Sequence, residues 1–370
     1  MRILYLVTSL GVGGAEKQVI DIAERMAARG HTVALISLKH ADEEWPVKIP
    51  VLRLNLAKTP TSVARGLGFA KKFLAIFHPD ILHSHTYPAN IFARLLRLIG
   101  SPAIVLNTIH NVYEGGWLRM VAYRSTGQLA DKVTAVSTAA AERFVTNGAV
   151  SARKMSVLTN GIDTSAFKPD RNQRKRMRSQ MQAGDRFIWL AVGRIVEAKD
   201  YPNLLRAFAL VHKARPEAEL WIAGEGEAGA ILEHLTADTQ EEPLLTSAVR
   251  ILGLHRDIPA LLDAADAFVL SSSWEGLPLA LAEAMSMEKP VVATDVGGVR
   301  ELAGDAGQVV PAKDSEALSN AMLHVMALTE KERRALGIAA RERIERLFSI
   351  EAKLGQWADL YATLMQEAGK

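Results

Sequence analysis

The chain has 370 residues, enough for two or three domains of the usual ~150 residues, and with 49% hydrophobic and 23% charged residues it has the composition of a globular protein. It contains no cysteine, which excludes a disulfide framework, a cysteine-ligated metal centre and thiol catalysis. The net charge is +3, but residues 1–168 carry 20 Lys and Arg against 11 Asp and Glu, while residues 169–370 carry 24 against 30. The basic first half indicates an anionic partner, with a chance excess of solvated charges as the alternative.

Short β-branched runs alternate with longer amphipathic stretches, which predicts parallel sheets with crossover helices. In the first half we expect strands at 2–8, 31–38, 81–84 and 103–108, and helices at 15–29, 61–77 and 88–98. In the second half we expect strands at 187–192, 219–223, 249–252, 267–270, 291–294 and 308–310. A polar, strongly basic stretch at 168–182 separates the two series, and we place the linker near 167–170. Helical stretches at 331–348 and 351–367 close the second domain or run back across the first.

A glycine-rich turn at residues 11–14 follows the first predicted strand. A dinucleotide fingerprint needs a third glycine where Glu16 stands, and an acidic residue where the second strand ends at Lys39. The fingerprint therefore fails. What remains is either an anion site at a helix N-terminus, formed by Gly13 and Gly14, or a tight turn.

Arg194 and Lys199 follow the first strand of the second half, five residues apart in a loop that ends before Pro202. Open α/β sheets bind their ligands at strand ends. Arginine offers a bidentate fork and lysine a compact point charge, so the two can close on one diphosphate. Two solvated loop cations are the alternative.

The densest signal is the run S-S-S-W-E-G-L-P-L-A-L-A-E-A-M that begins at Ser271. Pro278 stands where a first helical turn tolerates proline, so the N–H groups of residues 276–279 can face an anion. Glu275 before the helix and Glu283 on it can address the two ends of one sugar nucleotide, the reacting sugar and the ribose diol. A solvated and a capping glutamate are the alternative.

This run resembles the E-x7-E signature of the retaining glycosyltransferases of family 4 (glycosyl transferases group 1). The similarity covers nearly the whole chain. Its further motifs are the opening strand with Gly-Gly-Ala-Glu, the tetrad Asn160-Gly161-Ile162-Asp163, Gly193-Arg194…Lys199, Gly224-Glu225-Gly226 and Gly253…Asp257. The resemblance implies the α/β GT-B fold, in which two Rossmann-like, doubly wound domains face each other across a cleft. With the linker placed as above, we expect an acceptor domain at 1–168 and a nucleotide-sugar domain at 169–350. The helix at 351–370 either crosses back to the first domain or closes the second.

The resemblance also implies roles for single residues. The implied catalytic residues are Glu275, His110, Arg194 and Lys199. The implied donor-binding residues are Gly13, Gly14, Arg194, Lys199, Gly224, Leu254, His255, Gly276, Leu277, Leu279 and Glu283. Within the donor-binding set, Glu283 would hold the ribose, and Leu254 and His255 would lie near the base. The catalytic Glu275 would contact the sugar hydroxyls.

His110 resembles the family's histidine at the donor sugar, but Asn111 follows it where many relatives carry an acidic residue. This departure argues against an acid–base role borrowed for the position. We expect His83 and His85 to be structural. The chain contains no D-x-D motif, so we expect no metal cofactor, with the diphosphate charge met by Arg194, Lys199 and a helix N-terminus.

We therefore expect transfer of a hexose or N-acetylhexosamine from a nucleotide diphosphate sugar to an acceptor hydroxyl, with retention and with UDP as the default nucleotide. The acceptor is expected to be a lipid-linked glycan in cell-surface polysaccharide assembly. Residues 61–77 combine a basic and an apolar face, which predicts contact with an anionic membrane surface, or else a core-packed helix. A nucleotide-sugar epimerase and a non-catalytic nucleotide-sugar-binding subunit stay open as alternatives.

We expect no nucleic-acid partner, since the basic stretch near the linker has no interleaved aromatic residues. No stretch approaches the ~18 uninterrupted apolar residues of a membrane span, and the first apolar run is too short for a signal peptide. The expected location is cytoplasmic, with peripheral attachment to the cytoplasmic membrane face as an open addition.

Overall fold

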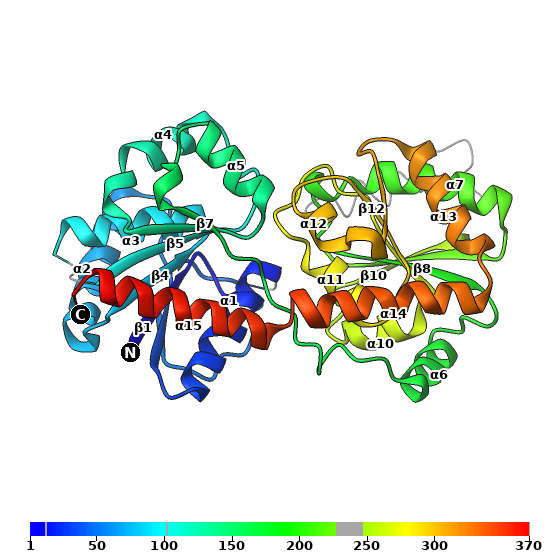
Figure 1. Cartoon of the computed structure of the whole chain (residues 1–370), viewed down its shortest axis with the longest axis horizontal. Helices are drawn as coiled ribbons and strands as arrows, with labels where there is room; N and C mark the ends of the chain where they lie inside the picture. The colour runs from blue at the N-terminus through cyan, green and yellow to red at the C-terminus, as the bar shows by residue number, and fades with distance from the viewer. Residues whose placement is uncertain (12, 101–102, 227–246, 370) are drawn as a thin grey trace. The chain divides into compact units, whose positions relative to one another are not determined.

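The computed structural model describes residues 1–11, 13–100, 103–226 and 247–369. They form two compact units, shown in Figure 1: Met1–Gly161 together with Ile350–Lys370, and Ile162–Ser349. Each unit is a Rossmann-like parallel sheet covered by helices, in agreement with the predicted fold class. The first boundary between the units lies at residue 161, a few residues before the linker that the sequence suggests.

The first unit is built on a seven-stranded parallel sheet in the order β3-β2-β1-β4-β5-β6-β7. Its strands are β1 (Arg2–Val7), β2 (Thr32–Ser37), β3 (Val51–Arg53), β4 (Ile81–His85), β5 (Ile104–Ile109), β6 (Lys132–Ala135) and β7 (Met155–Val157). The sequence analysis missed β3, β6 and β7, which are three or four residues long and therefore carry little periodicity. Chain order reverses between β1 and β4, so the loops that follow these two strands are neighbours.

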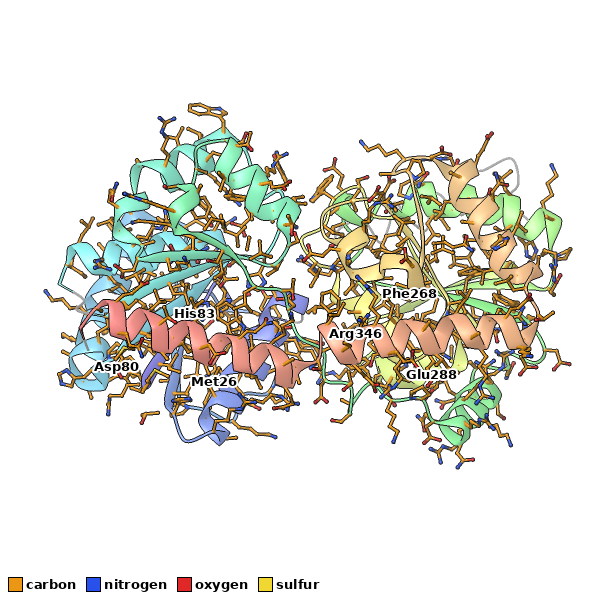
Figure 2. All side chains as sticks on the ribbon, in the orientation of Figure 1. Met26, Asp80, His83, Phe268, Glu288 and Arg346 are labelled. Atoms are coloured by element: carbon orange, nitrogen blue, oxygen red, sulfur yellow. The ribbon has the colours of Figure 1, made fainter. Side chains whose placement is uncertain are left out.

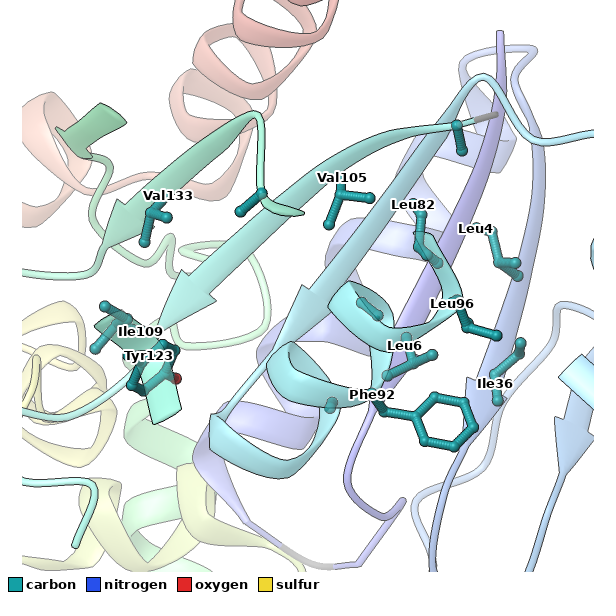
Figure 3. Packing of buried hydrophobic residues seen from close by; sticks show 14 of the residues in the cluster. Leu4, Leu6, Ile36, Leu82, Phe92, Leu96, Val105, Ile109, Tyr123 and Val133 are labelled. Atoms are coloured by element: carbon teal, nitrogen blue, oxygen red, sulfur yellow. The ribbon is translucent and has the colours of Figure 1, made fainter. Parts of the chain in front are cut away.

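Alternating side chains of this sheet face two different helix layers, as the two-residue period of a strand requires. The helices of the unit are α1 (Gly14–Ala28), α2 (Pro60–Phe77), α3 (Tyr87–Leu98), α4 (Trp117–Ser125), α5 (Thr138–Thr146) and α15 (Ile350–Glu367). Leu4 and Leu6 belong to the core cluster that includes Phe92 and Leu96 of α3, shown in Figure 3. Tyr5 belongs to the other cluster, which α1 and α15 cover.

The C-terminal helix α15 packs on the first unit through a buried chain of hydroxyl and imidazole groups. The Tyr361 hydroxyl lies 2.7 Å from His83 Nδ1 and 3.0 Å from the Tyr5 hydroxyl. The Trp357 ring lies against the His83 ring, with 4.7 Å between their centroids. Figure 2 labels His83 beside this helix. The histidine therefore joins β4 to the last helix of the chain.

The second unit contains a six-stranded parallel sheet among its described residues, in the order β10-β9-β8-β11-β12-β13. The strands are β8 (Phe187–Val192), β9 (Ala218–Ala223), β10 (Val249–Gly253), β11 (Ala267–Leu270), β12 (Val291–Thr294) and β13 (Gln308–Val310). All six agree with the predicted runs to within one residue. The helices are α6 (Arg171–Gln180), α7 (Tyr201–Ala214), α10 (Ile258–Ala264), α11 (Leu279–Ser286), α12 (Val299–Ala303), α13 (Ser315–Ala327) and α14 (Glu330–Leu347).

The basic stretch that the sequence analysis left without structure forms helix α6. The Asp170 carboxylate caps the helix by accepting hydrogen bonds from the N–H groups of Asn172 and Gln173. Arg174 and Arg178 then pair with Asp266, at 2.5 and 3.1 Å. A basic run with few apolar residues is thus tied to the unit by ion pairs, which periodicity does not reveal.

Among the residues described, no helix is both long and apolar enough to span a bilayer.

Candidate active site

Glycine turns gather at the carboxyl edge of the second unit's sheet. Gly193 follows β8, Gly224 follows β9, Gly253 ends β10 and Gly297 lies beyond β12. Strands β9 and β10 lie on one side of β8, whereas β12 and β13 lie beyond β11. The chain order therefore reverses between β8 and β11, and open α/β sheets bind ligands at such a switch point.

Lys199 and Glu275 come from the two loops at this switch point and form an ion pair. Lys199 ends the turn η3 (Glu197–Lys199), and Glu275 lies between β11 and α11. Lys199 Nζ lies 2.6 Å from Glu275 Oε1, and both side chains are largely buried. Partial burial reduces screening by water and salt, so the pair is stronger than one on the surface. The sequence analysis placed both residues at the donor but did not predict their contact.

Three consecutive serines hold this pair in place. The hydroxyl of Ser271 donates a hydrogen bond to the Lys199 carbonyl at 2.8 Å, and the hydroxyl of Ser272 donates one to Glu275 Oε1 at 2.7 Å. Ser273 donates from its hydroxyl to Asp200 Oδ2 at 2.9 Å. Each serine thus fixes a different group of the two loops. The run was visible in the sequence, but its partners become neighbours only in the folded chain.

Two glycines allow the loops to approach each other. A Cβ on Gly224, whose φ is +151°, would lie 2.0 Å from the Gly193 carbonyl oxygen. A Cβ on Gly297, whose φ is +55°, would lie 2.1 Å from the Glu275 carbonyl oxygen. Both distances are far inside van der Waals contact, and both backbone conformations disfavour other residues. The Tyr201 hydroxyl further fixes the first loop by donating to the Gly193 carbonyl at 2.8 Å.

The other predicted donor residues of this unit lie after the same strands or on helix α11, which follows one of them. Arg194 is exposed beside Gly193, and Gly276 and Leu277 are buried directly before α11, which begins at Leu279. Glu283 is half-buried on α11. Leu254 and His255 are half-buried after β10. His255 Nδ1 is buried and has no hydrogen-bond partner among the described residues.

In the first unit, His110 follows β5 and contacts a second histidine. Its Nε2 lies 2.9 Å from His85 Nδ1, so one of the two rings must supply the proton of this hydrogen bond. Burial lowers the pKa of His110 to about 4, and burial also holds the pKa of His85 well below its usual value. His110 is therefore neutral near pH 7 and can hydrogen-bond a sugar without contributing a charge.

Glu114 is a buried carboxyl group that the sequence analysis missed. The Tyr123 hydroxyl donates to its Oε2 at 2.7 Å, and the backbone N–H of His110 donates to its Oε1 at 3.3 Å. Burial raises the pKa of Glu114 to about 7. The sequence offered one signal for it: position 111, where many relatives carry an acid, is Asn111, and Glu114 is the next acidic residue, four positions after His110. Its carboxyl group therefore lies at the strand end that carries the predicted histidine.

The glycine turn of the first unit carries its own acid. Gly13 caps helix α1, which begins at Gly14, while Val12 lies outside the described residues. A Cβ on Gly13 would lie 2.5 Å from Glu16 Oε2. The Glu16 carboxylate, in the first turn of α1, therefore lies beside the glycine turn that the sequence analysis interprets as an anion site or a tight turn. Among the described residues of both units, no group of three metal-ligating side chains is placed to hold a metal ion.

Comparison with known proteins supplies the family. The family described as Glycosyltransferase Family 4 matches residues 12–166, and the one described as Glycosyl transferases group 1 matches residues 186–327. A GDP-mannose-dependent alpha-(1-6)-phosphatidylinositol monomannoside mannosyltransferase of Mycolicibacterium smegmatis is 30% identical over 269 residues, which cover 69% of this chain and 68% of that protein. The chain belongs to glycosyltransferase family 4.

A second relative, from Escherichia coli, is a UDP-Gal:alpha-D-GlcNAc-diphosphoundecaprenol alpha-1,3-galactosyltransferase, 27% identical over 77% of this chain and 76% of its own. Among solved structures, HepE of Anabaena bound to UDP gives a TM-score of 0.81 at 23% identity over 98% of this chain and 100% of that one. Sucrose-phosphate synthase of Thermosynechococcus elongatus gives a TM-score of 0.85 at 23% identity, over 99% and 100%. These likenesses confirm the GT-B fold. The protein is a glycosyltransferase that uses a nucleotide sugar.

Proposed function

We propose that this glycosyltransferase moves a hexose or N-acetylhexosamine from a UDP-sugar to a hydroxyl group of a lipid-linked glycan, with retention of the anomeric configuration. The observation that carries the proposal is the Lys199–Glu275 pair at the switch point of the second unit. One relative is named for a UDP-sugar and a diphosphoundecaprenol acceptor, and another for a phosphatidylinositol mannoside. Both acceptors join a glycan to a lipid through phosphate.

In this proposal Lys199 and the exposed Arg194 neutralise the donor diphosphate. Charge grows on the leaving phosphate as the bond to the sugar's anomeric carbon breaks, so fixed cations stabilise the transition state more than the ground state. The acceptor oxygen bonds to the same carbon on the same face, and its proton passes to the departing phosphate oxygen. Glu275 orients the sugar through its hydroxyl groups. No divalent metal takes part, and EDTA is expected to leave the rate unchanged.

The remaining predicted residues complete the donor site. Glu283 on α11 binds the ribose diol, and the unpartnered Nδ1 of His255 faces the base with Leu254. The N–H groups of Leu277 and Leu279 bind phosphate oxygens at the start of α11.

A transfer assay with radiolabelled UDP- and GDP-sugars and a polyprenyl-diphosphate-linked sugar, run with and without EDTA, tests the proposal. We expect label in the lipid product from one UDP-sugar, equal rates in EDTA, and retained configuration in the NMR spectrum of the product. Transfer from a GDP-sugar alone would overturn the nucleotide assignment. Abolition by EDTA with rescue by a divalent metal would overturn the metal-free mechanism, and an inverted product would overturn retention.

A further inference from the structure

The outer face of α4 in the first unit is apolar and exposed. Trp117, Leu118 and Val121 are 71%, 66% and 51% exposed, and Tyr113 in the preceding loop is 47% exposed. Tyr123 is the fully buried residue of this nine-residue helix, and it anchors the helix through Glu114. Contiguous apolar surface of this kind marks a place where another molecule or a membrane binds.

Arginines surround these apolar side chains. Arg119 and Arg124 lie on α4 and Arg143 lies on α5, and all three are exposed. Arg124 and Arg143 line a hollow of about 410 Å³ together with Trp117 and Val121. Glu114 is the acidic residue of that lining, and its carboxyl group is buried and hydrogen-bonded to Tyr123. The accessible charge among the residues that line this hollow is therefore positive.

Helix α2 is the helix for which the sequence analysis predicted membrane contact or core packing. Most of its apolar residues pack in the core of the first unit. Leu74 is buried, and Phe73 and Phe77 stack on each other while packing against the first core cluster. The large apolar side chains that α2 leaves exposed are Phe69 and Ile76. The prediction of an amphipathic helix at 61–77 is thus correct for the helix, but its apolar face is largely occupied by the protein's own core.

We propose that the α4 surface, defined as Tyr113, Trp117, Leu118 and Val121 with Arg119, Arg124 and Arg143, docks on a bilayer that contains anionic lipid. Aromatic and aliphatic side chains enter the interface between headgroups and acyl chains, while arginines pair with lipid phosphates and keep their charged ends in water. The basic balance of residues 1–168 adds long-range attraction to a negative leaflet. This inference rests on the proposed function in that a lipid-linked acceptor would be met at the same membrane.

Liposome flotation of the full chain tests the docking surface. Vesicles of phosphatidylcholine alone are compared with vesicles that contain phosphatidylglycerol as well. We expect flotation with the anionic vesicles only, weakened by high salt because exposed charges are screened. The double variant Trp117→Ser/Leu118→Ser should lower the bound fraction at least tenfold. The control variant Phe69→Ser/Ile76→Ser also removes two exposed apolar side chains, from α2, and should bind as the parent protein does.

Equal binding by the α4 variant, loss of binding in the α2 variant, or no flotation of the parent protein would each overturn the proposal. A concentration-dependent dimer that disappears in the α4 variant, without flotation, would assign the surface to a second copy instead. Donor-induced thermal stabilisation and transfer to a water-soluble acceptor should be unchanged in the α4 variant, which shows that it folds. If the parent protein floats with anionic vesicles but neither it nor the variants transfer sugar, the proposed function is wrong and the docking surface is still supported.

Discussion

Lys199 Nζ and Glu275 Oε1 lie 2.6 Å apart, although 76 residues separate them in the chain. The pair joins the loops after β8 and β11 at the switch point of the sheet. In the free protein each charge therefore neutralises the other. Under the proposed function, the donor diphosphate replaces Glu275 as the anionic partner of Lys199, and the Glu275 carboxylate then accepts hydrogen bonds from the sugar hydroxyls.

Removing either member of the pair should abolish most turnover. We expect Lys199→Ala to lower kcat by about 10²–10³, the range found when a single group that stabilises developing charge is removed. Glu275→Ala should also lose most of kcat, because the sugar is no longer oriented and Lys199 loses its partner. Steady-state rates with a saturating donor measure the effect. Near-normal turnover in both variants would show that the pair is structural.

Ser272 should act as a positioning residue through Glu275. Its buried hydroxyl donates to the carboxylate at 2.7 Å, and a hydrogen bond to a charged group contributes about 1.5–3 kcal/mol. Ser272→Ala should therefore lower kcat by roughly 10-fold to 100-fold, with a smaller change in the KM for the donor. The control is Ser319→Ala, which removes another buried hydroxyl from α13. Equal losses in both variants would indicate general destabilisation instead.

Gly224 should tolerate no side chain without loss of donor binding. Alanine there would place a Cβ 2.0 Å from the Gly193 carbonyl oxygen and push apart the turns that flank Lys199. We expect Gly224→Ala to weaken nucleotide binding by at least tenfold in calorimetry. Gly68→Ala is the matched control, because a Cβ on Gly68 meets no atom within 4 Å. Unchanged affinity in Gly224→Ala would mean that the turns do not shape the site.

The strands and most helices of this protein could be predicted from sequence because each carries its own periodicity. Buried runs such as Val291–Thr294 are apolar on both faces, and a parallel sheet requires that pattern. Helix α6 was not predicted because it has no apolar stripe. Arg174 and Arg178 bind it instead to Asp266, which is 92 and 88 residues away in the chain. Its fold therefore depends on a tertiary contact.

Protonation of buried histidines should make stability depend on pH. Burial lowers the pKa of His83, His85 and His110, the last to about 4. Between pH ~6.5 and 4 these histidines are therefore protonated in the unfolded chain but stay neutral in the folded protein. The free energy of unfolding should fall over this window as pH decreases, by up to about 1.4 kcal/mol per pH unit for each histidine. Urea unfolding at pH 7 and pH 5 measures the slope.

Glu114 provides the control for this slope. Burial raises its pKa to about 7, so as pH falls from 7 towards ~4.5 the folded protein gains a proton before the unfolded chain does, and stability rises. Glu114→Gln removes this opposing contribution and should steepen the fall in stability. A pH-independent parent protein, or a variant with the parent's slope, would contradict the assignment of these buried groups.

Arg194, Lys199, Glu275 and Glu283 could be proposed as donor residues from sequence because they stand in and after loops that follow strands, with spacings that a family shares. Their mutual geometry was not predictable. Ser271 and Ser273 bond to Lys199 and Asp200, more than seventy residues away in the chain. The bonds from Ser272 to Glu275 and from Tyr123 to Glu114 are closer in sequence, but they form only when loop and helix place the two groups together. Burial also decides protonation, and no local pattern around His110 indicates that its pKa lies near 4.

The most direct test of the donor site is thermal unfolding of the parent protein and of Lys199→Ala, with and without UDP and in the absence of metal. A ligand at 100 times its Kd stabilises the folded state by about 2.7 kcal/mol, which gives an easily measured rise in Tm. We predict that UDP raises the Tm of the parent protein and leaves that of Lys199→Ala nearly unchanged. An equal rise in both proteins, or none in the parent, would contradict the assignment of the diphosphate to Lys199.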